Sequence, residues 1–257
     1  MTANQCVTLW VGDSLGPVER ACFRSVLRHG HELALYVYRE PSGVPEGVEL
    51  RDAANILAES AVFHHRSGSV AFFADWFRYE LLKRGAGTWV DTDLYLLAPL
   101  DIERPCLFGL ETPEILNNCV LRLPTDSPIL PPLLAVFEQR VVPKWLPLHH
   151  YLAARLRQWL NGEADVSKLP WGSTGPLALT AVAKRFGLSS QALPPDAFNP
   201  VPWHKADWIR DPAISLGEMT TRRTVGVHLW NECIKSFKNL PAVDGSFLAR
   251  LHGEGAA

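Results

Sequence analysis

The chain has 257 residues, of which 47% are hydrophobic and 20% are charged, values typical of a globular protein long enough for one large α/β domain. Its formal net charge of −2 excludes a strong overall positive field of the kind that attracts DNA, RNA or an anionic membrane. No window approaches the roughly 20 consecutive apolar residues of a transmembrane helix.

The first half of the chain alternates between strand and helix patterns. Buried strands are expected at residues 7–11 and 33–38, with a short extended piece near Val48. Between the first two, an amphipathic pattern over 18–29 predicts a helix that Pro17 begins and Gly30 ends. This alternation is typical of a parallel sheet with crossover helices.

The clearest helix is predicted over 69–83, with Gly85 as its C-terminal stop. Its apolar residues occupy both faces, so we expect it to be covered on both sides. Asp75 and Arg78 lie three residues apart on its flank. An exposed pair of this kind contributes about 0.5 kcal/mol or less. A part-buried pair is costly unless it has a function, and these two groups suit phosphate or sugar hydroxyl oxygens.

The second half is expected to be mostly helical. Strand patterns follow at 106–111 and 115–123, and helix patterns at 128–140, 149–160 and 176–186. A late strand is expected at 225–230, and residues 253–257 are expected to be frayed. No repeat or linker divides the sequence, so a single domain is predicted.

Five dispersed cysteines lack the Cys-x-x-Cys spacing of a zinc or redox site. They predict buried free thiols in a reducing compartment. The first five residues contain no basic residue and no long apolar stretch, so no signal peptide is expected. We therefore expect a cytoplasmic protein, at most in peripheral contact with a membrane.

Asp91 and Asp93 are the most informative residues of the chain. In an extended chain their side chains would point to the same side. Two such carboxylates repel each other unless a cation or donor groups lie between them, and oxygen ligands suit a hard divalent ion that also holds phosphate oxygens. A bare Asp-x-Asp is more often a solvated strand end. The strand before this pair and the acid–base helix upstream favour a site.

His228 lies on the strand expected at 225–230 and shares a face with Gly226 and Trp230. A histidine on a half-buried strand is most often simply hydrogen-bonded. Here the small Gly226 is expected to leave room beside the two rings, which favours a diphosphate or metal contact.

Trp10 ends the first strand, near the strand ends where ligands of open α/β sheets bind. Its ring is either part of the core or a platform for a nucleotide base. The loop 171–176 has the pattern of a helix start with free backbone N–H groups, which suits anions or hydroxyls and equally suits plain capping.

Several stretches, taken together and in order, resemble one known family. It is the family of α-1,4-galactosyl- and N-acetylglucosaminyltransferases, within the retaining glycosyltransferases that have a DXD sugar-binding region (glycosyltransferase family 32). The resemblance covers nearly the whole chain. The stretches that carry it are ADWFRYELL (74–82), GAGTWVDTD (85–93), LNNCVL (116–121), TGP (174–176), NPVPW (199–203) and VHLWN (227–231).

The resemblance implies the GT-A fold, an α/β architecture with a Rossmann-like, mostly parallel mixed sheet flanked by helices. Within a single domain over 1–257, residues 1–125 would form the nucleotide-sugar-binding part. Residues 126–252 would form the mostly helical, acceptor-side part with the returning strand. A nucleotide-sugar donor, most of all a UDP-sugar, and a Mn²⁺ or Mg²⁺ ion are implied as well.

The same resemblance gives a role to each residue that matches the family's acidic motifs. Asp93 would ligate the metal directly, and Asp91 would contact the ribose or donor sugar with a share in the metal. Asp75 and Arg78 match the Asp-x-x-Arg that holds the donor sugar. These four residues are the ones that we expect to support catalysis.

The remaining matched residues would surround the donor. Trp10 matches the first-strand aromatic residue that stacks on the base, and Asn117 lies in the segment after the acidic pair. His228, Trp230 and Asn231 would close over the diphosphate, with His228 and Asn231 also as metal ligands. Animal members carry a membrane anchor and lumenal disulfides, and this sequence shows neither. A bacterial-type cytoplasmic enzyme, at most at the inner face of a membrane, is therefore expected.

The sequence thus predicts a metal-dependent retaining glycosyltransferase. It would move a hexose or N-acetylhexosamine from a nucleotide sugar to a hydroxyl of a glycan or glycolipid, as in cell-surface polysaccharide synthesis. A metal-dependent phospho- or nucleotidyltransferase is an alternative that needs a third carboxylate, for which Asp101 and Glu111 are the candidates. A non-catalytic sugar-binding relative is the other alternative. No nucleic-acid partner is expected.

Overall fold

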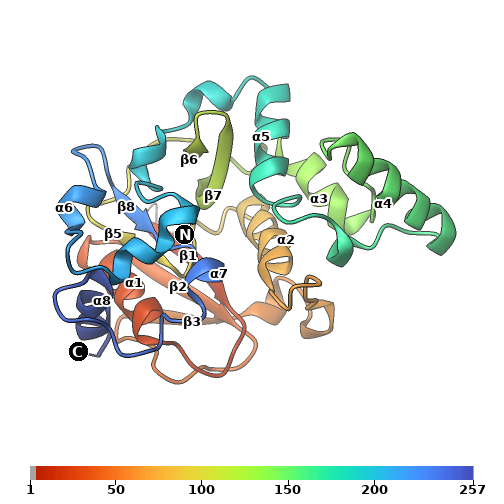
Figure 1. Cartoon of the computed structure of the whole chain (residues 1–257). Coiled ribbons are helices and arrows are strands. Elements are labelled where there is room, and N and C mark those ends of the chain that lie inside the picture. Colours follow the sequence, from red (N-terminus) through yellow and green to blue (C-terminus); the bar gives the residue numbers. More distant parts are fainter. Residues whose placement is uncertain (1–3, 257) are drawn as a thin grey trace.

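In the computed structural model, which describes residues 4–256, a six-stranded mixed sheet forms the centre of the molecule (Figure 1). Its strand order is β3-β2-β1-β4-β7-β6. The first four of these strands run parallel, β7 is antiparallel to β4, and β6 is antiparallel to β7. The predicted α/β fold with a mostly parallel mixed sheet is confirmed. The strands are β1 (Gln5–Trp10), β2 (Glu32–Val37), β3 (Val48–Asp52), β4 (Thr88–Val90), β6 (Leu107–Thr112) and β7 (Ile115–Arg122).

The crossover helices form where the sequence predicts them. α1 (Pro17–Arg28) connects β1 to β2, and it has a proline at its first turn. Gly30 adopts a positive φ of 81° in the turn that leads into β2. α2 (Ala71–Lys83) connects β3 to β4.

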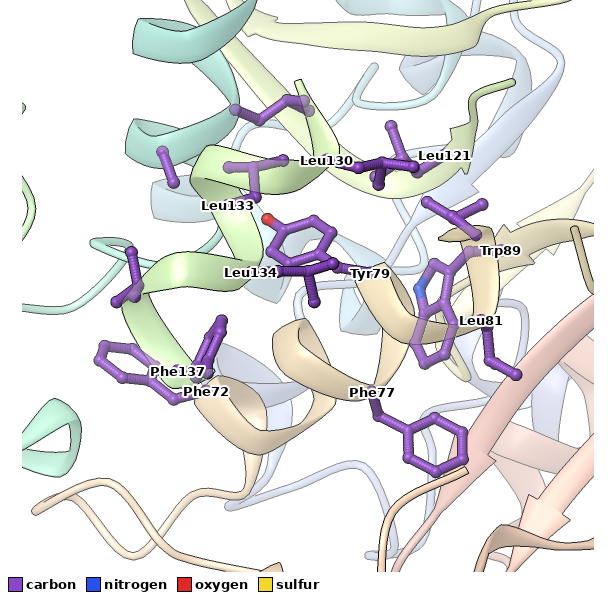
Figure 2. Close-up of a cluster of buried hydrophobic side chains, with 14 of the residues drawn as sticks. Phe72, Phe77, Tyr79, Leu81, Trp89, Leu121, Leu130, Leu133, Leu134 and Phe137 are labelled. Atoms are coloured by element: carbon purple, nitrogen blue, oxygen red, sulfur yellow. The ribbon is translucent and has the colours of Figure 1, made fainter. Parts of the chain in front are cut away.

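Apolar side chains cover α2 on both sides, as its sequence pattern predicts. Figure 2 shows Phe72, Tyr79 and Leu81 of α2 between β4 and α3 (Leu130–Glu138). On the α3 side, Trp76 stacks on Phe137 with ring centroids 5.7 Å apart and an angle of 1° between the planes. On the side of the sheet, Phe77 contacts Tyr36 of β2 edge to face, with ring centroids 5.6 Å apart. A helix held in this way presents the side chains on its flank, Asp75 and Arg78 among them, at a fixed position.

The second half of the chain is mostly helical, and the one strand in its described residues completes a small sheet. α4 (Leu148–Asn161) has 14 residues and α5 (Pro176–Arg185) has ten, whereas α6 (Leu216–Met219) and α7 (Asn231–Ile234) have four each. The 3₁₀ helices of the chain span Ala53–Asn55, Glu59–Ala61, Val166–Lys168, Ser189–Gln191, Pro195–Ala197 and Trp203–Arg210. The small sheet pairs β5 (Leu94–Leu96) antiparallel with β8 (Gly226–His228). This pairing sets His228 opposite Leu94 and so brings the late strand beside the acidic pair.

Two expectations about the C-terminal third are wrong. The late strand is shorter than predicted, because it ends at His228 and Trp230 adopts a left-handed backbone conformation with φ 59°. Residues 253–256 are not frayed but belong to α8 (Phe247–Ala256), which packs against α1; residue 257 lies outside the described residues. A Cβ at Gly255 would overlap the backbone of Pro17, so this glycine permits close approach of the two helices rather than fraying.

All five cysteines are unpaired, as predicted. Four are buried, but Cys233 is exposed, contrary to the expectation for that residue. Burial raises the pKa of the Cys6 thiol to about 12, which leaves it uncharged at neutral pH. Over residues 4–256, no helix is both long and apolar enough to cross a membrane. The expected lack of a signal peptide concerns residues 1–5, of which 1–3 lie outside the described part.

Candidate active site

The candidate site lies at the end of the sheet where the parallel strands finish. β1 is paired with β2 on one side and with β4 on the other. The chain runs outward from β1 to β2 and β3 and then crosses back to β4, so the strand order reverses between β1 and β4. Crevices at such a switch point bind ligands in open α/β folds. Trp10 ends β1 and Asp91 directly follows β4.

The acidic pair occupies a turn and not an extended strand end. β4 stops at Val90, and Leu94 N–H donates to Asp91 O at 3.1 Å, so the chain reverses between the two carboxylates. The expected reason for their convergence, side-chain alternation along a strand, is therefore wrong. The convergence itself is present, since the turn brings both carboxylates to the same imidazole.

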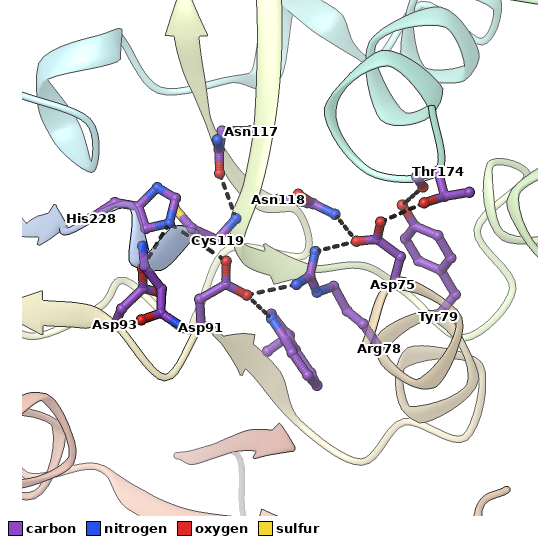
Figure 3. A network of polar contacts seen from close by, with 12 residues as sticks. Asp75, Arg78, Tyr79, Asp91, Asp93, Asn117, Asn118, Cys119, Thr174 and His228 are labelled. Atoms are coloured by element: carbon purple, nitrogen blue, oxygen red, sulfur yellow. Dashed lines mark hydrogen bonds and ion pairs between the residues drawn. The ribbon is translucent and has the colours of Figure 1, made fainter. Parts of the chain in front are cut away.

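Asp91, Asp93 and His228 form the centre of the site (Figure 3). His228 Nε2 lies 3.5 Å from Asp93 Oδ2 and 3.8 Å from Asp91 Oδ2. One ligand atom from each of the three residues lies within 4.8 Å of the other two. Two carboxylates and an imidazole at this spacing are a donor set that fits a divalent cation such as Mn²⁺ or Mg²⁺.

The tautomer of His228 follows from its partner Asn199. The amide Nδ2 of Asn199 donates to Leu110 O at 3.0 Å, so its Oδ1 must face His228 Nδ1, 3.1 Å away. His228 Nδ1 therefore carries the proton and donates it to Asn199. Nε2 is then the nitrogen that faces the two carboxylates, and in the neutral imidazole it is the atom that can bind a metal.

Asp93 is buried and partly stabilised by the protein. Its Oδ2 accepts a hydrogen bond from Asn231 N–H at 2.6 Å. Burial raises the pKa of the Asp93 carboxyl, and the neighbouring Asp91 raises it further, whereas His228 and the Asn231 N–H counter the rise. A cation between these carboxylates would remove the repulsion that raises this pKa.

Arg78 connects the acidic pair to α2. Its guanidinium donates to Asp91 Oδ1 at 2.6 Å and to Asp75 Oδ1 at 3.0 Å, and it lies 4.5 Å from the ring centroid of Trp89. Trp89 Nε1 also donates to Asp91 Oδ1 at 2.7 Å. Asp91 therefore has one oxygen engaged by two donors and the other facing His228. The Nε of Arg78 is buried without a partner among residues 4–256.

Asp75 is held by donors from three elements, as Figure 3 shows. Besides Arg78, it accepts from Asn118 Nδ2 at 2.8 Å and from Thr174 Oγ1 at 2.7 Å. Burial raises the pKa of the Asp75 carboxyl, while Arg78 and these two donors act in the opposite direction. A Cβ on Gly175 would lie 3.0 Å from Asp75 Oδ2, so the loop before α5 packs directly on this carboxylate. The predicted helix-start loop thus belongs to the site.

Trp10 borders a hollow at the ends of β1 and β2. The hollow has a volume of about 310 Å³, and its lining includes Tyr38, Arg39 and Glu59. Trp10 Nε1 is buried without a hydrogen-bond partner among the described residues. The place fits the predicted role of Trp10 as a platform for a base, and the hollow is of a size that suits a small ligand.

Gly226 and two predicted site residues, Asn117 and Trp230, make contacts within the protein. Gly226 leaves no room for a ligand, because a Cβ there would lie 3.1 Å from Leu96 Cδ2 across the small sheet, which corrects the expectation. Asn117 donates to Glu111 Oε2 and accepts from Cys119 N–H, so its amide is engaged within the β6–β7 hairpin. Trp230 lies against His228 with ring centroids 4.2 Å apart and donates to Val201 O.

Asn231, the further predicted metal ligand, has its amide oxygen occupied by Lys238. The Lys238 ammonium donates to Asn231 Oδ1 and to Glu19 on α1, and both charged groups are buried. Among residues 4–256, the group that could hold a metal ion consists of Asp91, Asp93 and His228, and neither Asp101 nor Glu111 belongs to it.

Sequence reasoning missed the residues that orient the site. Asn199 and Lys238 fix His228 and Asn231, and Asn118 and Thr174 hold Asp75. Asn118, Thr174 and Asn199 all fall inside the matched motifs, so the motifs contained the signal although no role was assigned to these residues. Lys238 lies outside every motif, and only the tertiary structure shows its contact.

The chain is similar in sequence to known galactosyltransferases, although no family model matches it. The lactosylceramide 4-alpha-galactosyltransferase of Mus musculus is 28% identical over 193 residues, which cover 70% of this chain and 46% of that protein. The Homo sapiens protein is 26% identical with the same coverage, and the Pongo pygmaeus protein is 26% identical with 75% of its length covered. The chain thus spans about half the length of the mouse and human relatives.

Among solved structures, the PaToxG Glycosyltransferase is similar to this chain. The two are 14% identical in sequence and align with a TM-score of 0.44, over 73% of this chain and 72% of the other.

Proposed function

We propose that this chain is a GT-A-like glycosyltransferase and that it transfers a hexose or N-acetylhexosamine from a nucleotide sugar to a hydroxyl group of a glycan or glycolipid. The observation that carries the proposal is the convergence of Asp91, Asp93 and the Nε2 atom of His228. Such a donor set binds the kind of cation that also binds a diphosphate. Because the similar proteins are galactosyltransferases, UDP-galactose is the first donor to test.

The donor set fits Mn²⁺ or Mg²⁺, and we infer that Asp93, Asp91 and His228 hold the ion. When bound there, the ion would supply positive charge to stabilise the diphosphate leaving group. The inference is supported by the tautomer of His228, which Asn199 fixes in the metal-binding form. The open oxygen of Asp91 supports it as well, because Arg78 and Trp89 occupy only the other oxygen.

The network on α2 would orient the donor sugar. Arg78 fixes Asp91 from one side and Asp75 from the other, so the three side chains move as a unit. The buried, unpartnered Nε of Arg78 is a donor that a sugar or phosphate oxygen could satisfy after a small displacement. The hollow beside Trp10 would take the base, with the ring of Trp10 as its wall.

Retention of configuration is part of the proposal and rests on the family resemblance. The acceptor hydroxyl would attack the anomeric carbon from the face that the leaving group departs, and its proton would pass to the departing phosphate oxygen. Arg78 would keep the donor in place during this step. The acceptor class, a cell-surface glycan or glycolipid, is proposed from the relatives' names and from the resemblance. The unpaired cysteines favour the reducing cytoplasm as the compartment.

The proposal is tested by measuring hydrolysis of a panel of UDP-, GDP- and ADP-sugars with Mn²⁺, with Mg²⁺ and with EDTA. We expect slow hydrolysis of one UDP-sugar that requires the metal. Asp93→Ala should abolish that metal-dependent turnover, whereas Asp101→Ala, an exposed acidic residue outside the metal cluster, should retain it.

The same panel separates the alternatives. Metal-dependent hydrolysis of nucleoside triphosphates, with none of any nucleotide sugar, would favour a phospho- or nucleotidyltransferase. Binding of a UDP-sugar without any hydrolysis or transfer would favour a non-catalytic relative. Metal-dependent turnover that is unchanged in Asp93→Ala would contradict the role given to that residue.

A further inference from the structure

α4 exposes a row of large apolar side chains. Five of its fourteen residues are leucine or tryptophan side chains that are 57% to 80% exposed. Single exposed apolar residues are normal on protein surfaces, but a contiguous set marks an interaction surface. We call this set the α4 apolar face, and it consists of Leu148, Leu152, Leu156, Trp159 and Leu160.

The α4 apolar face points away from the rest of the protein. At 100° per residue, its members fall within a sector of about 120° around the helix. Ala154, the one buried residue of α4, lies on the opposite side of the helix. Figure 1 shows α4, in green, at the outer edge of the molecule, on the side away from α8. The α4 apolar face therefore does not pack against the core of this protein.

Positive charge surrounds the α4 apolar face. Residues 139–162 contain no Asp or Glu, and they contain four basic residues and two histidines. Arg155 and Arg157 fall on the two flanks of the apolar sector when the helix is drawn as a wheel. Within residues 4–256, neither arginine nor Lys144 forms an ion pair with a carboxylate, although Arg140 pairs with Glu163. The charge on this face is uncompensated.

Apolar residues in the middle of a helix face, with arginine on both flanks and a tryptophan near one end, are the pattern of a helix that lies in a membrane interface. The acyl boundary takes the leucines, tryptophan favours the headgroup level, and anionic headgroups attract arginine. A protein partner would equally bury the leucines, but it would need acidic groups on both flanks. The net charge of −2 gives no sign of attraction to an anionic membrane, because it sums the charges of the whole chain and hides the local excess of positive charge on α4.

We propose that α4 docks this protein onto an anionic lipid surface by inserting the α4 apolar face into the headgroup region. The helix lies parallel to the membrane and does not cross it, because its fourteen residues are too few to span the roughly 30 Å of hydrocarbon. This inference does not depend on the proposed transferase activity, since it rests on exposure and charge alone.

The test is flotation of the purified full chain with two kinds of vesicle, phosphatidylcholine alone and phosphatidylcholine mixed with phosphatidylglycerol. The wild-type chain should float with the anionic vesicles and not with the neutral ones. The variant Leu152→Ser/Leu156→Ser/Trp159→Ser should lose at least about tenfold in partition, because it removes most of the inserted surface. Arg155→Gln/Arg157→Gln should lose about tenfold as well and should remove most of the salt dependence.

A matched control distinguishes insertion of the α4 apolar face from nonspecific adsorption to vesicles. Leu240→Ser/Val243→Ser removes two exposed apolar side chains elsewhere and should change the partition by less than about twofold. The proposal is overturned if the wild-type chain does not float with anionic vesicles, or if the control variant loses as much as the α4 variant.

Light scattering tests for the other occupant. If the wild-type chain is a dimer, the triple variant is a monomer and neither floats with vesicles, the α4 apolar face is a contact between copies of this chain and the proposal is overturned. Hydrolysis of the nucleotide sugar is measured on the triple variant in the same series. Retained hydrolysis with lost flotation supports docking by α4, whereas loss of hydrolysis alone bears on the proposed function and not on docking.

Discussion

α2 and α4 depart from the usual distribution of residues in opposite directions. α2 buries an aspartate and an arginine, whereas α4 exposes leucines and a tryptophan and buries only one alanine. Charged residues are almost never fully buried without partners, and large apolar patches are rare on the surface of soluble proteins. Each departure therefore needs a compensating contact.

The two helices differ in whether that contact lies within the chain. On α2 it does, because Asp75 and Arg78 are paired with each other and with Asp91, Asn118 and Thr174. On α4 it does not, because nothing in residues 4–256 covers the exposed leucines. A buried charge therefore indicates an internal site, whereas an uncovered apolar face indicates a partner outside the chain.

The largest effect is expected from breaking the internal network. Arg78→Met should lower the free energy of unfolding by about 3–5 kcal/mol, because it leaves two carboxylates without their buried counter-charge. Lys83→Met changes an exposed ion pair on the same helix and should cost about 1 kcal/mol or less. Urea unfolding of both variants checks the difference, and equal costs would show that the Arg78 network is not a buried charge cluster in solution.

A smaller effect, on Mn²⁺ affinity, is expected from removing the hydrogen bond that orients His228. Asn199→Leu removes the acceptor for His228 Nδ1 and should weaken Mn²⁺ binding by about 10- to 100-fold. Asn199→Asp keeps an acceptor oxygen there and should retain most of the affinity. Isothermal titration with Mn²⁺ measures both, and unchanged binding in Asn199→Leu would contradict the positioning role given to Asn199.

The pH dependence of the acidic cluster should be measurable without substrate. Because the pKa of Asp93 is raised on folding, the metal-free protein gains stability from its proton at low pH. That contribution is lost as pH rises through the folded-state pKa. Mn²⁺ binds the deprotonated carboxylate, so the shift in Tm that it causes should grow over the same rise in pH.

Melting curves with and without Mn²⁺ between about pH 4 and about pH 8 test this sign. Asp93→Asn should flatten the pH dependence of the metal-induced shift. A Mn²⁺ shift that shrinks with rising pH would contradict the assignment.

The smallest stability effect is expected on α4. Leu152→Ser/Leu156→Ser should change the free energy of unfolding by no more than about 0.5 kcal/mol, because both side chains are already in water. Leu81→Ala on α2 should cost about 2–5 kcal/mol, because Leu81 is fully buried. A large loss from the α4 variant would mean that the helix packs against the chain in solution, and it would remove the basis for membrane docking.

Local patterns predict those elements in which sequence neighbours decide the structure. The alternation in the first half specifies the parallel strands and α1, and apolar residues on both faces correctly indicate a covered α2. The patterns fail where distant residues decide. Gly255 and Gly226 suggest looseness when read locally, but each fits a close approach to another segment, α1 for Gly255 and β5 for Gly226.

The site divides in the same way. The motifs indicate Asp75, Arg78, Asp91, Asp93 and His228, and the structure brings these five side chains together. The turn between Asp91 and Asp93 was not predicted, although aspartate is a common turn residue, because the apolar runs on both sides of Asp-Thr-Asp favoured an extended chain. The roles of Asn199 and Lys238 were not predicted either. Asn199 contacts His228, 29 residues later in the sequence, and Lys238 contacts Glu19 on α1 and Asn231 at the start of α7.

The central claim is that one cation binds between Asp91, Asp93 and His228 and holds a diphosphate there. Crystals grown with Mn²⁺ and UDP, measured at the manganese absorption edge, test it directly. We predict one strong anomalous peak within ligand distance, about 2.0–2.3 Å, of Asp93 and His228, with the UDP base beside Trp10. A manganese peak away from these residues, or UDP bound elsewhere on the molecule, would contradict the account.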